Sequence, residues 1–191
     1  MDKTFKTVAS SYISISELML PSHSNFSGKI HGGYILSLLD QVAFACGSKF
    51  SGNYCVTASV DTVNFLSPIE VGELVTMKAS VNYVGKSSMI IGIRVEAENI
   101  QTGNIKHCNS SYFTMVAKDS EGKSVTVPGL ILSTFDEVRR FCNCLKQIAL
   151  KKEKDLHEEI FDYSSKDTLL ALTKYNIKLE LDSNIPIGKS E

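Results

Sequence analysis

A carboxylate stands in the middle of an apolar run. Asp40 lies within residues 34–46, which are otherwise apolar almost all round. Burying an unpaired carboxylate is costly, so Asp40 is expected to be paired, close to water, or protonated. Two roles fit such a side chain. One is a structural aspartate hydrogen-bonded across a subunit interface, and the other is a general base or nucleophile with a tuned pKa. The pattern leaves both open.

The same run opens with His31, Gly32 and Gly33. Glycines at a helix start leave backbone N–H groups uncovered, and these groups point outward with the positive end of the helix dipole. Such donors can hold an oxyanion or a polarised carbonyl. The plainer interpretation is a tight loop-to-helix turn that needs glycine dihedral angles. His31 fits a turn or pocket-lining residue better than it fits a base.

The spacing of these groups limits how they act together. Gly33 and Asp40 are separated by two helical turns, which is about 10 Å along a helix axis. A reacting carbonyl should lie within roughly 3 Å of both its hydrogen-bond donor and its attacking group. One chain is therefore not expected to supply both groups to one substrate. If both act, we expect the site to combine two subunits.

A long buried helix should position these residues. The apolar pattern over 34–46 is too long for a strand and predicts a helix, which Gly47 is expected to end. A helix that is apolar on every side is a buried helix. Its least apolar face is predicted to face a cleft or a partner subunit. That face carries Gly33, Ser37, Asp40, Gln41 and Phe44.

Strands surround this helix in the sequence. Apolar and polar residues alternate over 75–83 and 89–97, which indicates half-buried antiparallel strands, and residues 84–88 are expected to join them as a hairpin connection. Residues 21–30 predict a loop. The expected order is one strand, the buried helix, then four strands in a meander. The expected strands are 5–18, 54–67, 75–83, 89–97 and about 106–117.

Composition excludes several classes of protein. The 191 residues are 43% hydrophobic and 21% charged, which is ordinary for a globular domain with an appendage. A net charge of −1 gives no general attraction to nucleic acid. The N-terminus lacks the apolar block of a secretory signal, and no run approaches the roughly 20 apolar residues of a membrane span. We expect a cytoplasmic protein with no membrane span and no nucleic-acid partner.

The cysteines do not indicate a metal site. Five cysteines without a Cys-x-x-Cys pair and four scattered histidines predict buried, reduced thiols and no metal. Beyond residue 130, an apolar stripe over 138–149 predicts a helix, and a second short helix is expected near 166–175. The expected domains are 1–130 and a C-terminal helical and charged extension, 131–191.

Four segments occur in an order and spacing that is similar to one family. They are "NFSGKIHGGYILSLLDQVA" (25–43), "VTASVDTVNFLSPIEVGELV" (56–75), "VNYVGKSSM" (81–89) and "YFTMVAKDSEGKSVTVP" (112–128). Together they resemble the hot-dog-fold acyl-CoA thioesterases, in the acyl-CoA hydrolase branch of small bacterial enzymes and the mammalian brain-type hydrolase. The resemblance runs from about Ile13 to Leu130.

This resemblance implies an α+β hot-dog fold, with about five antiparallel strands wrapped around one long helix. It also implies homodimers, often trimers of dimers, that bind acyl-CoA at the dimer interface. Asp40 would activate water or attack the thioester carbonyl, and Asn25 from the other subunit would position the water or the carbonyl. The N–H of Gly33, with Gly32, would polarise that carbonyl.

The turn at 84–89 matches the family segment that contacts coenzyme A. Lys86 would meet a CoA phosphate as a point charge, and Ser87 and Ser88 would offer hydroxyl and backbone donors. Many relatives carry Arg-Thr-Ser here. His31 would line the same substrate site. The implied reaction hydrolyses a fatty acyl-CoA to the free acid and CoA with water as co-substrate, and it needs no cofactor or metal.

Other functions use the same fold. One alternative is a non-catalytic acyl-CoA sensor or assembly protein, but the presence of both Asn25 and Asp40 favours the hydrolase. A hot-dog dehydratase or hydratase is a third possibility, and it usually recruits a histidine together with an acid. His31 precedes the glycines instead of lying in the helix body, which disfavours that chemistry. The motifs do not specify the acyl chain length.

Overall fold

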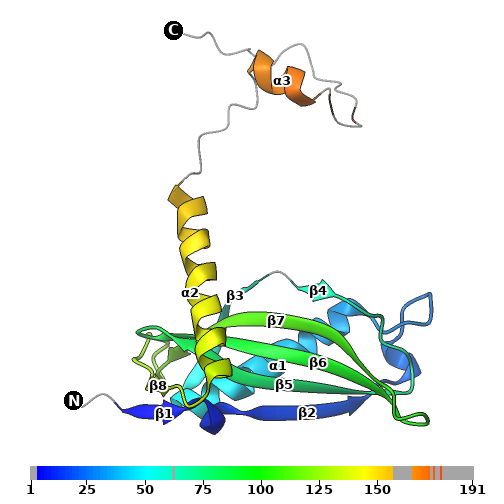
Figure 1. Ribbon diagram of the computed structural model, residues 1–191, viewed down its shortest axis with the longest axis horizontal. Coiled ribbons are helices and arrows are strands. Elements are labelled where there is room, and N and C mark those ends of the chain that lie inside the picture. Colours follow the sequence, from blue (N-terminus) through cyan, green and yellow to red (C-terminus); the bar gives the residue numbers. More distant parts are fainter. Residues whose placement is uncertain (1–3, 62, 157–164, 173, 175–176, 178–191) are drawn as a thin grey trace. The chain divides into compact units, whose positions relative to one another are not determined.

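A computed structural model describes residues 4–61, 63–156, 165–172, 174 and 177 (Figure 1). The strands are β1 (Phe5–Thr7), β2 (Ile13–Leu18), β3 (Tyr54–Val60), β4 (Asn64–Phe65), β5 (Glu73–Val84), β6 (Ser88–Asn99), β7 (Ile105–Lys118) and β8 (Gly129–Ile131). The helices are α1 (Gly32–Ser51), α2 (Phe135–Leu156) and α3 (Lys166–Leu172), with short 3₁₀ turns at Val8–Ser11 and Pro21–His23.

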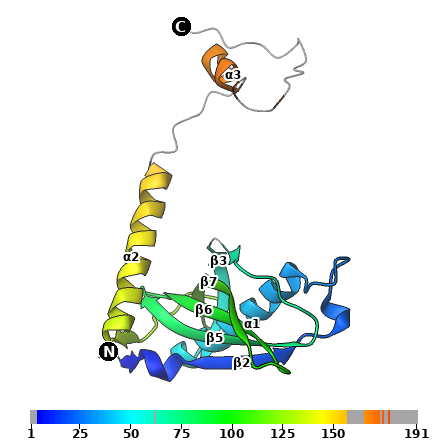
Figure 2. The same cartoon turned by 45° about the vertical axis from the view of Figure 1, so that its right-hand side comes forward.

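The main sheet has the strand order β2-β5-β6-β7-β3, every pair is antiparallel, and β4 adds to β7. The curled sheet holds α1 against one face (Figure 2). The predicted antiparallel sheet around one long helix is therefore confirmed. The predicted meander is wrong in one respect, because β3 pairs with β7 and not with β5. Since α1 stands between β2 and β3 in the chain, it carries the chain across the sheet to the opposite edge.

The predicted first strand, 5–18, is broken in two. β1 leaves the main sheet and pairs in parallel with β8, an element that the sequence pattern did not indicate. Ser11 explains the break. Its buried hydroxyl donates to Val8 O at 2.6 Å and accepts from the Val81 N–H at 2.9 Å, so a side chain replaces part of the backbone ladder. The predicted strand 54–67 is likewise divided, into β3 and β4.

α1 is longer than predicted, and Gly47 does not end it. Gly47 lies inside the helix, where an added Cβ would be 3.2 Å from Ile91 Cδ1 and 3.4 Å from Cys55 Sγ. The glycine thus allows the helix to approach the sheet closely. The helix ends at Gly52, which adopts the left-handed conformation with φ 76°.

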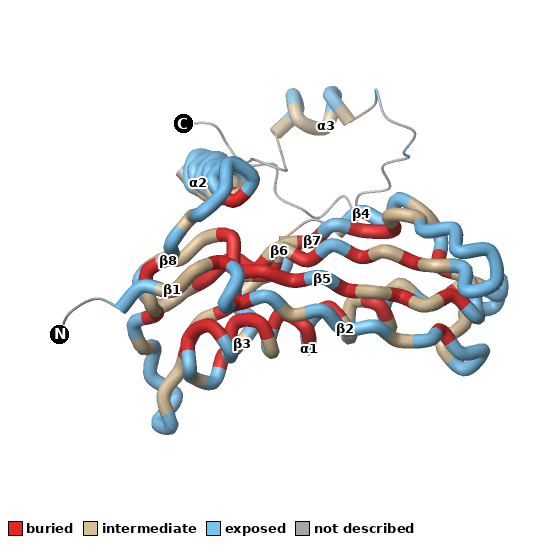
Figure 3. Tube along the Cα trace, turned by 60° about the horizontal axis from the view of Figure 1, so that its bottom comes forward, coloured by how far each residue is buried: buried red, intermediate tan, exposed pale blue. Residues whose placement is uncertain are grey.

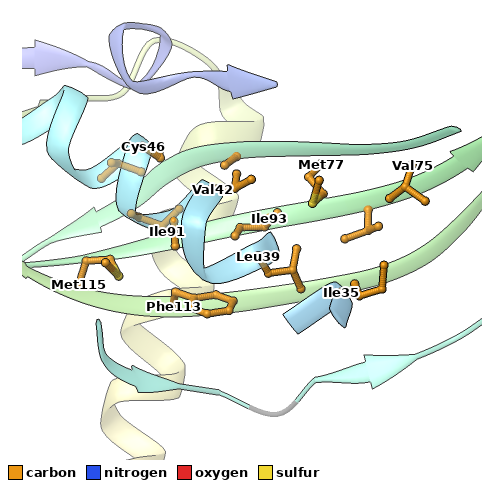
Figure 4. Close-up of a cluster of buried hydrophobic side chains, with 14 of the residues drawn as sticks. Ile35, Leu39, Val42, Cys46, Val75, Met77, Ile91, Ile93, Phe113 and Met115 are labelled. Carbon is orange, nitrogen blue, oxygen red and sulfur yellow. The ribbon is translucent and has the colours of Figure 1, made fainter. Parts of the chain in front are cut away.

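One face of α1 forms the core with the inner face of the sheet. The buried residues are concentrated on α1 and on β5, β6 and β7 (Figure 3). Leu39 and Cys46 are fully buried and pack among side chains such as Met77, Ile91 and Phe113 (Figure 4). The opposite face of the helix is exposed, and the residues between the two faces are partly buried. It carries the predicted set Gly33, Ser37, Asp40, Gln41 and Phe44.

The chain separates into two units, Met1–Gln147 and Ile148–Glu191. The predicted helix over 138–149 is confirmed within α2, which runs across this division. The predicted helix near 166–175 is confirmed as α3, although residues 173 and 175 lie outside the described residues. The predicted domain boundary at residue 130 stays a prediction.

All five cysteines are free, and four of them are buried. Burial raises the pKa of Cys46 to about 12 and that of Cys144 to about 11. The expectation of free thiols therefore holds for all five cysteines, and the expectation of burial holds for every one except Cys142, which is exposed on α2.

We predict that replacing Leu39 by Ala lowers the free energy of unfolding by about 2 to 5 kcal/mol, because it leaves a cavity between α1 and the sheet. Urea denaturation measures the change. Leu150→Ala is the matched control, since Leu150 is 64% exposed on α2 and its loss should change the free energy by about 0.5 kcal/mol or less. Equal midpoints for the two variants would contradict the described core.

We predict that a disulfide reagent at mildly alkaline pH modifies one thiol per native chain quickly and all five in guanidinium. Cys142 should account for the fast reaction, because the thiolate is the reactive form and burial keeps Cys46 and Cys144 protonated. The Cys142→Ser variant should lose the fast phase. A second fast thiol in that variant would show that a buried cysteine is accessible.

Candidate active site

Asp40 lies in the middle of α1, on its exposed face. The prediction that it is buried is wrong for the chain by itself. The sheet covers only the side of the helix that carries Leu39 and Val42, so the neighbouring Asp40 points away from the core. The expectation that the carboxylate is paired is met, because the Thr57 hydroxyl donates a hydrogen bond to Asp40 Oδ1 at 2.5 Å.

Thr57 is the site residue that sequence reasoning missed. It belongs to the edge strand β3, and its Oγ1 also lies 3.3 Å from Met115 Sδ. Directly after it, the β3–β7 register shifts between Thr57 and Ser59, so that Ala58 is an extra residue on β3. Such bulges bend a strand and re-aim a side chain. No spacing in the sequence signals the contact, since it depends on how β3 returns beside α1.

A pocket of about 690 Å³ opens beside this pair. Asp40, Gln41, Thr57 and the phenol of Tyr54 supply its polar side-chain groups. The rest of its lining is mainly apolar and comes from the outer face of α1, from the two edge strands β3 and β2, and from β7, which pairs with β3. A mostly apolar pocket with a few polar groups is typical of a small-molecule site.

Gly33 lies in the first turn of α1 and is exposed. His31 is the N-cap residue, and its side chain makes no capping hydrogen bond. Nothing lies within 4 Å of where a Gly33 Cβ would be, so the approach to its backbone is open. His31 is exposed, and its backbone N–H donates to the backbone carbonyl of His23 at 2.9 Å, as expected of a turn residue.

Asn25 joins Gly32 at a second pocket, of about 280 Å³, which Ile35 and Phe65 also line. The Asn25 Oδ1 accepts hydrogen bonds from the backbone N–H groups of Ser27, at 2.9 Å, and Lys29, at 3.1 Å. The amide group is therefore fixed by its own loop.

The structure thus brings Asn25 and Gly32 together, but it places Asp40 at a different pocket. This arrangement agrees with the helix spacing, which separates the start of α1 from Asp40 by about 10 Å. Neither of these two pockets contains both the glycine donors and the carboxylate.

The predicted hairpin connection lies between β5 and β6. The Gly85 N–H donates to Ser88 O at 2.8 Å, and the carbonyls of Ser87 and Lys86 accept from Ala117 N at 2.9 Å and Val127 N at 3.0 Å. The backbone of the turn is therefore tied to β7 and to the segment that follows it. The side chain of Lys86 is exposed.

Among the described residues, no three histidine, cysteine, aspartate or glutamate side chains are grouped as ligands for a metal ion. In the same residues, no helix is both long and apolar enough to cross a membrane.

The chain is similar in sequence to several named proteins. Protein VdlD of Helicobacter pylori is 43% identical over 146 residues, which are 76% of this chain and 83% of VdlD. The uncharacterized acyl-CoA thioester hydrolase YkhA of Bacillus subtilis is 30% identical over 141 residues, 74% of this chain and 82% of YkhA. The human cytosolic acyl coenzyme A thioester hydrolase is 34% identical over 137 residues, 71% of this chain but 36% of the human protein.

Solved structures agree in fold. An apo-hexameric acyl-CoA thioesterase superposes with a TM-score of 0.78 and 30% identity, covering 81% of this chain and 99% of that chain. The acyl-CoA hydrolase of Staphylococcus aureus, in complex with butyryl coenzyme A and coenzyme A, gives a TM-score of 0.74 and 27% identity, covering 88% and 99%.

The family model described as the thioesterase superfamily matches residues 27–104, the stretch that holds the glycine turn, Asp40, Thr57 and the β5–β6 turn. With the curled sheet, the central helix and the relatives above, this match establishes that the chain belongs to the hot-dog acyl-CoA thioester hydrolases of the thioesterase superfamily.

Proposed function

We propose that this protein hydrolyses acyl-CoA to the free carboxylic acid and CoA, and that Asp40 is its catalytic carboxylate. The observation that carries the proposal is the Asp40–Thr57 hydrogen bond at the mouth of an apolar pocket on the exposed face of α1. A thioester is already an activated acyl group. One positioned carboxylate and a set of carbonyl-polarising donors are therefore a sufficient catalytic apparatus.

Thr57 orients this carboxylate. Its hydrogen bond occupies Asp40 Oδ1, so Oδ2 is the oxygen that takes a proton from water or attacks the carbonyl carbon. The solved structures of the Staphylococcus aureus acyl-CoA hydrolase include variants in which an asparagine, an aspartate or a threonine is replaced by alanine. Those three positions have the same spacing as Asn25, Asp40 and Thr57, which supports these three residues as members of one site.

The start of α1 polarises the thioester carbonyl. The uncapped N–H of Gly33, together with that of Gly32, points out of the helix with its dipole, and developing negative charge on the carbonyl oxygen is stabilised there. Asn25 has its Oδ1 held by backbone donors, so its amide Nδ2 is the group that positions the water or the carbonyl. His31 lines the approach to these donors.

The two halves of the site come from two subunits. A homodimer in which the exposed faces of two α1 helices meet would bring Gly33 and Asn25 of one chain to Asp40 of the other. A closed twofold arrangement provides two such sites. A trimer of these dimers is proposed in addition, because the structural neighbours include hexameric enzymes.

Coenzyme A contacts the turn between β5 and β6. The exposed Lys86 meets a phosphate as a point charge, and Ser87 and Ser88 offer hydroxyl donors. Because the backbone of this turn is tied to β7, the lysine projects from a fixed base. Water is the co-substrate, and the reaction as proposed uses no metal and no further cofactor.

We predict that Asp40→Asn lowers kcat for thiol release by about 100-fold or more, because the amide neither accepts a proton from water nor attacks a carbonyl. Thiol release from a series of acyl-CoA substrates measures kcat, and CoA binding should change little. Glu121→Gln is the matched control, since it makes the same chemical change on an exposed loop carboxylate. A wild type that binds acyl-CoA but releases no thiol from any substrate would contradict hydrolysis and favour a sensor.

We predict that two inactive variants restore activity when they share a dimer. Asn25→Ala and Asp40→Asn damage opposite halves of the proposed site, so a mixed dimer has one site with both changes and one intact site. Chains mixed by co-expression should recover about a quarter of the wild-type activity per chain, given random pairing into twofold dimers. Each variant expressed alone is the control, since its dimers contain no intact site. No recovery in verified mixed dimers would place the complete site in one chain.

A further inference from the structure

A groove leads away from the Asp40–Thr57 pair between α1 and β3. α1 borders it from Asp40 to Phe44, and β3 borders it from Thr57 back to Tyr54, with both residue pairs lining the same pocket. The helix and the strand therefore form two walls of one groove. The 2.5 Å hydrogen bond between Thr57 and Asp40 lies at one end of this groove.

Two aromatic rings stand at the other end of this groove. The rings of Phe44 and Tyr54 meet edge to face, with their centroids 5.4 Å apart and an angle of 61° between their planes. Phe44 is 39% exposed and Tyr54 is 62% exposed, so both rings lie at the pocket surface and not in the core. The two rings contact each other, one from α1 and one from β3, so they bridge the two walls of the groove.

The groove is polar at its start and apolar further along. Its lining includes Ile15, the half-buried Val56 and Met115, which is 1% exposed. Apart from the Tyr54 phenol, its polar side chains are those of Asp40, Gln41 and Thr57. Its lining contains no lysine or arginine. A neutral alkyl chain attached to a carbonyl carbon matches this distribution, since the carbonyl meets the polar end and the chain meets the apolar walls.

We propose that the acyl chain of the substrate lies in this groove and that the Phe44–Tyr54 pair limits its length, which rests on the proposed function. Four residues of helix span about 6 Å and three residues of strand span about 10 Å. With carbon–carbon bonds of about 1.5 Å, this groove holds a chain of roughly eight carbons or fewer. The substrate class is thus acyl-CoA with an uncharged short- or medium-chain acyl group, and a terminal carboxylate on that group is disfavoured because no lysine or arginine lines the groove.

The test measures kcat/KM for thiol release from straight-chain acyl-CoAs, from acetyl to palmitoyl, in wild type, Phe44→Ala, Tyr54→Ala and Phe44→Trp. In wild type, kcat/KM should rise about fourfold per methylene up to roughly eight carbons and then fall. Phe44→Ala and Tyr54→Ala should move the optimum to chains longer by about two to four carbons. Phe44→Trp should move it to shorter chains.

Phe135→Ala is the control, because Phe135 is 95% exposed at the start of α2 and does not line the groove. Its chain-length profile should match that of wild type. Since Phe44 and Tyr54 are partly exposed, their variants should fold, and thermal denaturation verifies this. Folded variants that all keep the wild-type profile would overturn the placement of the acyl chain, whereas an inactive wild type would overturn hydrolysis itself.

Discussion

The packing of one face of α1 against the inner side of the sheet determines where the candidate site residues on this helix lie. Leu39 and Cys46 are fully buried there, and Gly47 lets the helix approach Ile91 closely. A helix that is fixed along one face has no freedom to rotate, so its other face must be presented outward. Asp40 is on that outward face. The free energy that holds the carboxylate in position therefore comes from its apolar neighbours in the sequence.

The local arrangement around Asp40 avoids the cost that a buried carboxylate would carry. In the chain by itself the group stays in contact with water, and one neutral donor, the Thr57 hydroxyl, holds one of its oxygens. The bulge at Ala58 bends β3 directly beside this donor. A strand edge and a helix are rigid elements, so they hold the carboxylate more firmly than a loop would.

The regular part of the fold could be predicted from the sequence, because its signals are local. Alternation along residues 75–83 and 89–97 predicted β5 and β6, and the helix pattern predicted which face would carry Asp40. The errors have non-local causes. Gly47 reads as a helix end, yet contact with the sheet requires a glycine inside the helix. The position of β3, and with it the contact of Thr57 with Asp40, depends on pairing with β7, which lies far along the chain. No period in the sequence specifies that partner.

The length of α1 is also the physical reason for proposing a site that combines two chains. The uncapped donors at Gly33 and the carboxylate of Asp40 are on the same rigid helix, about 10 Å apart, and no side-chain movement brings them to one carbonyl. In the proposed dimer, a second copy placed by a twofold axis would solve the problem without any change in either chain, since each helix start would then face the middle of the other helix. The same exposed face also carries Phe44, which borders the groove beside Asp40. In the proposed dimer, one helix face would thus supply the carboxylate, the carbonyl donors and part of the acyl-chain wall, and two chains would have to meet to form one site.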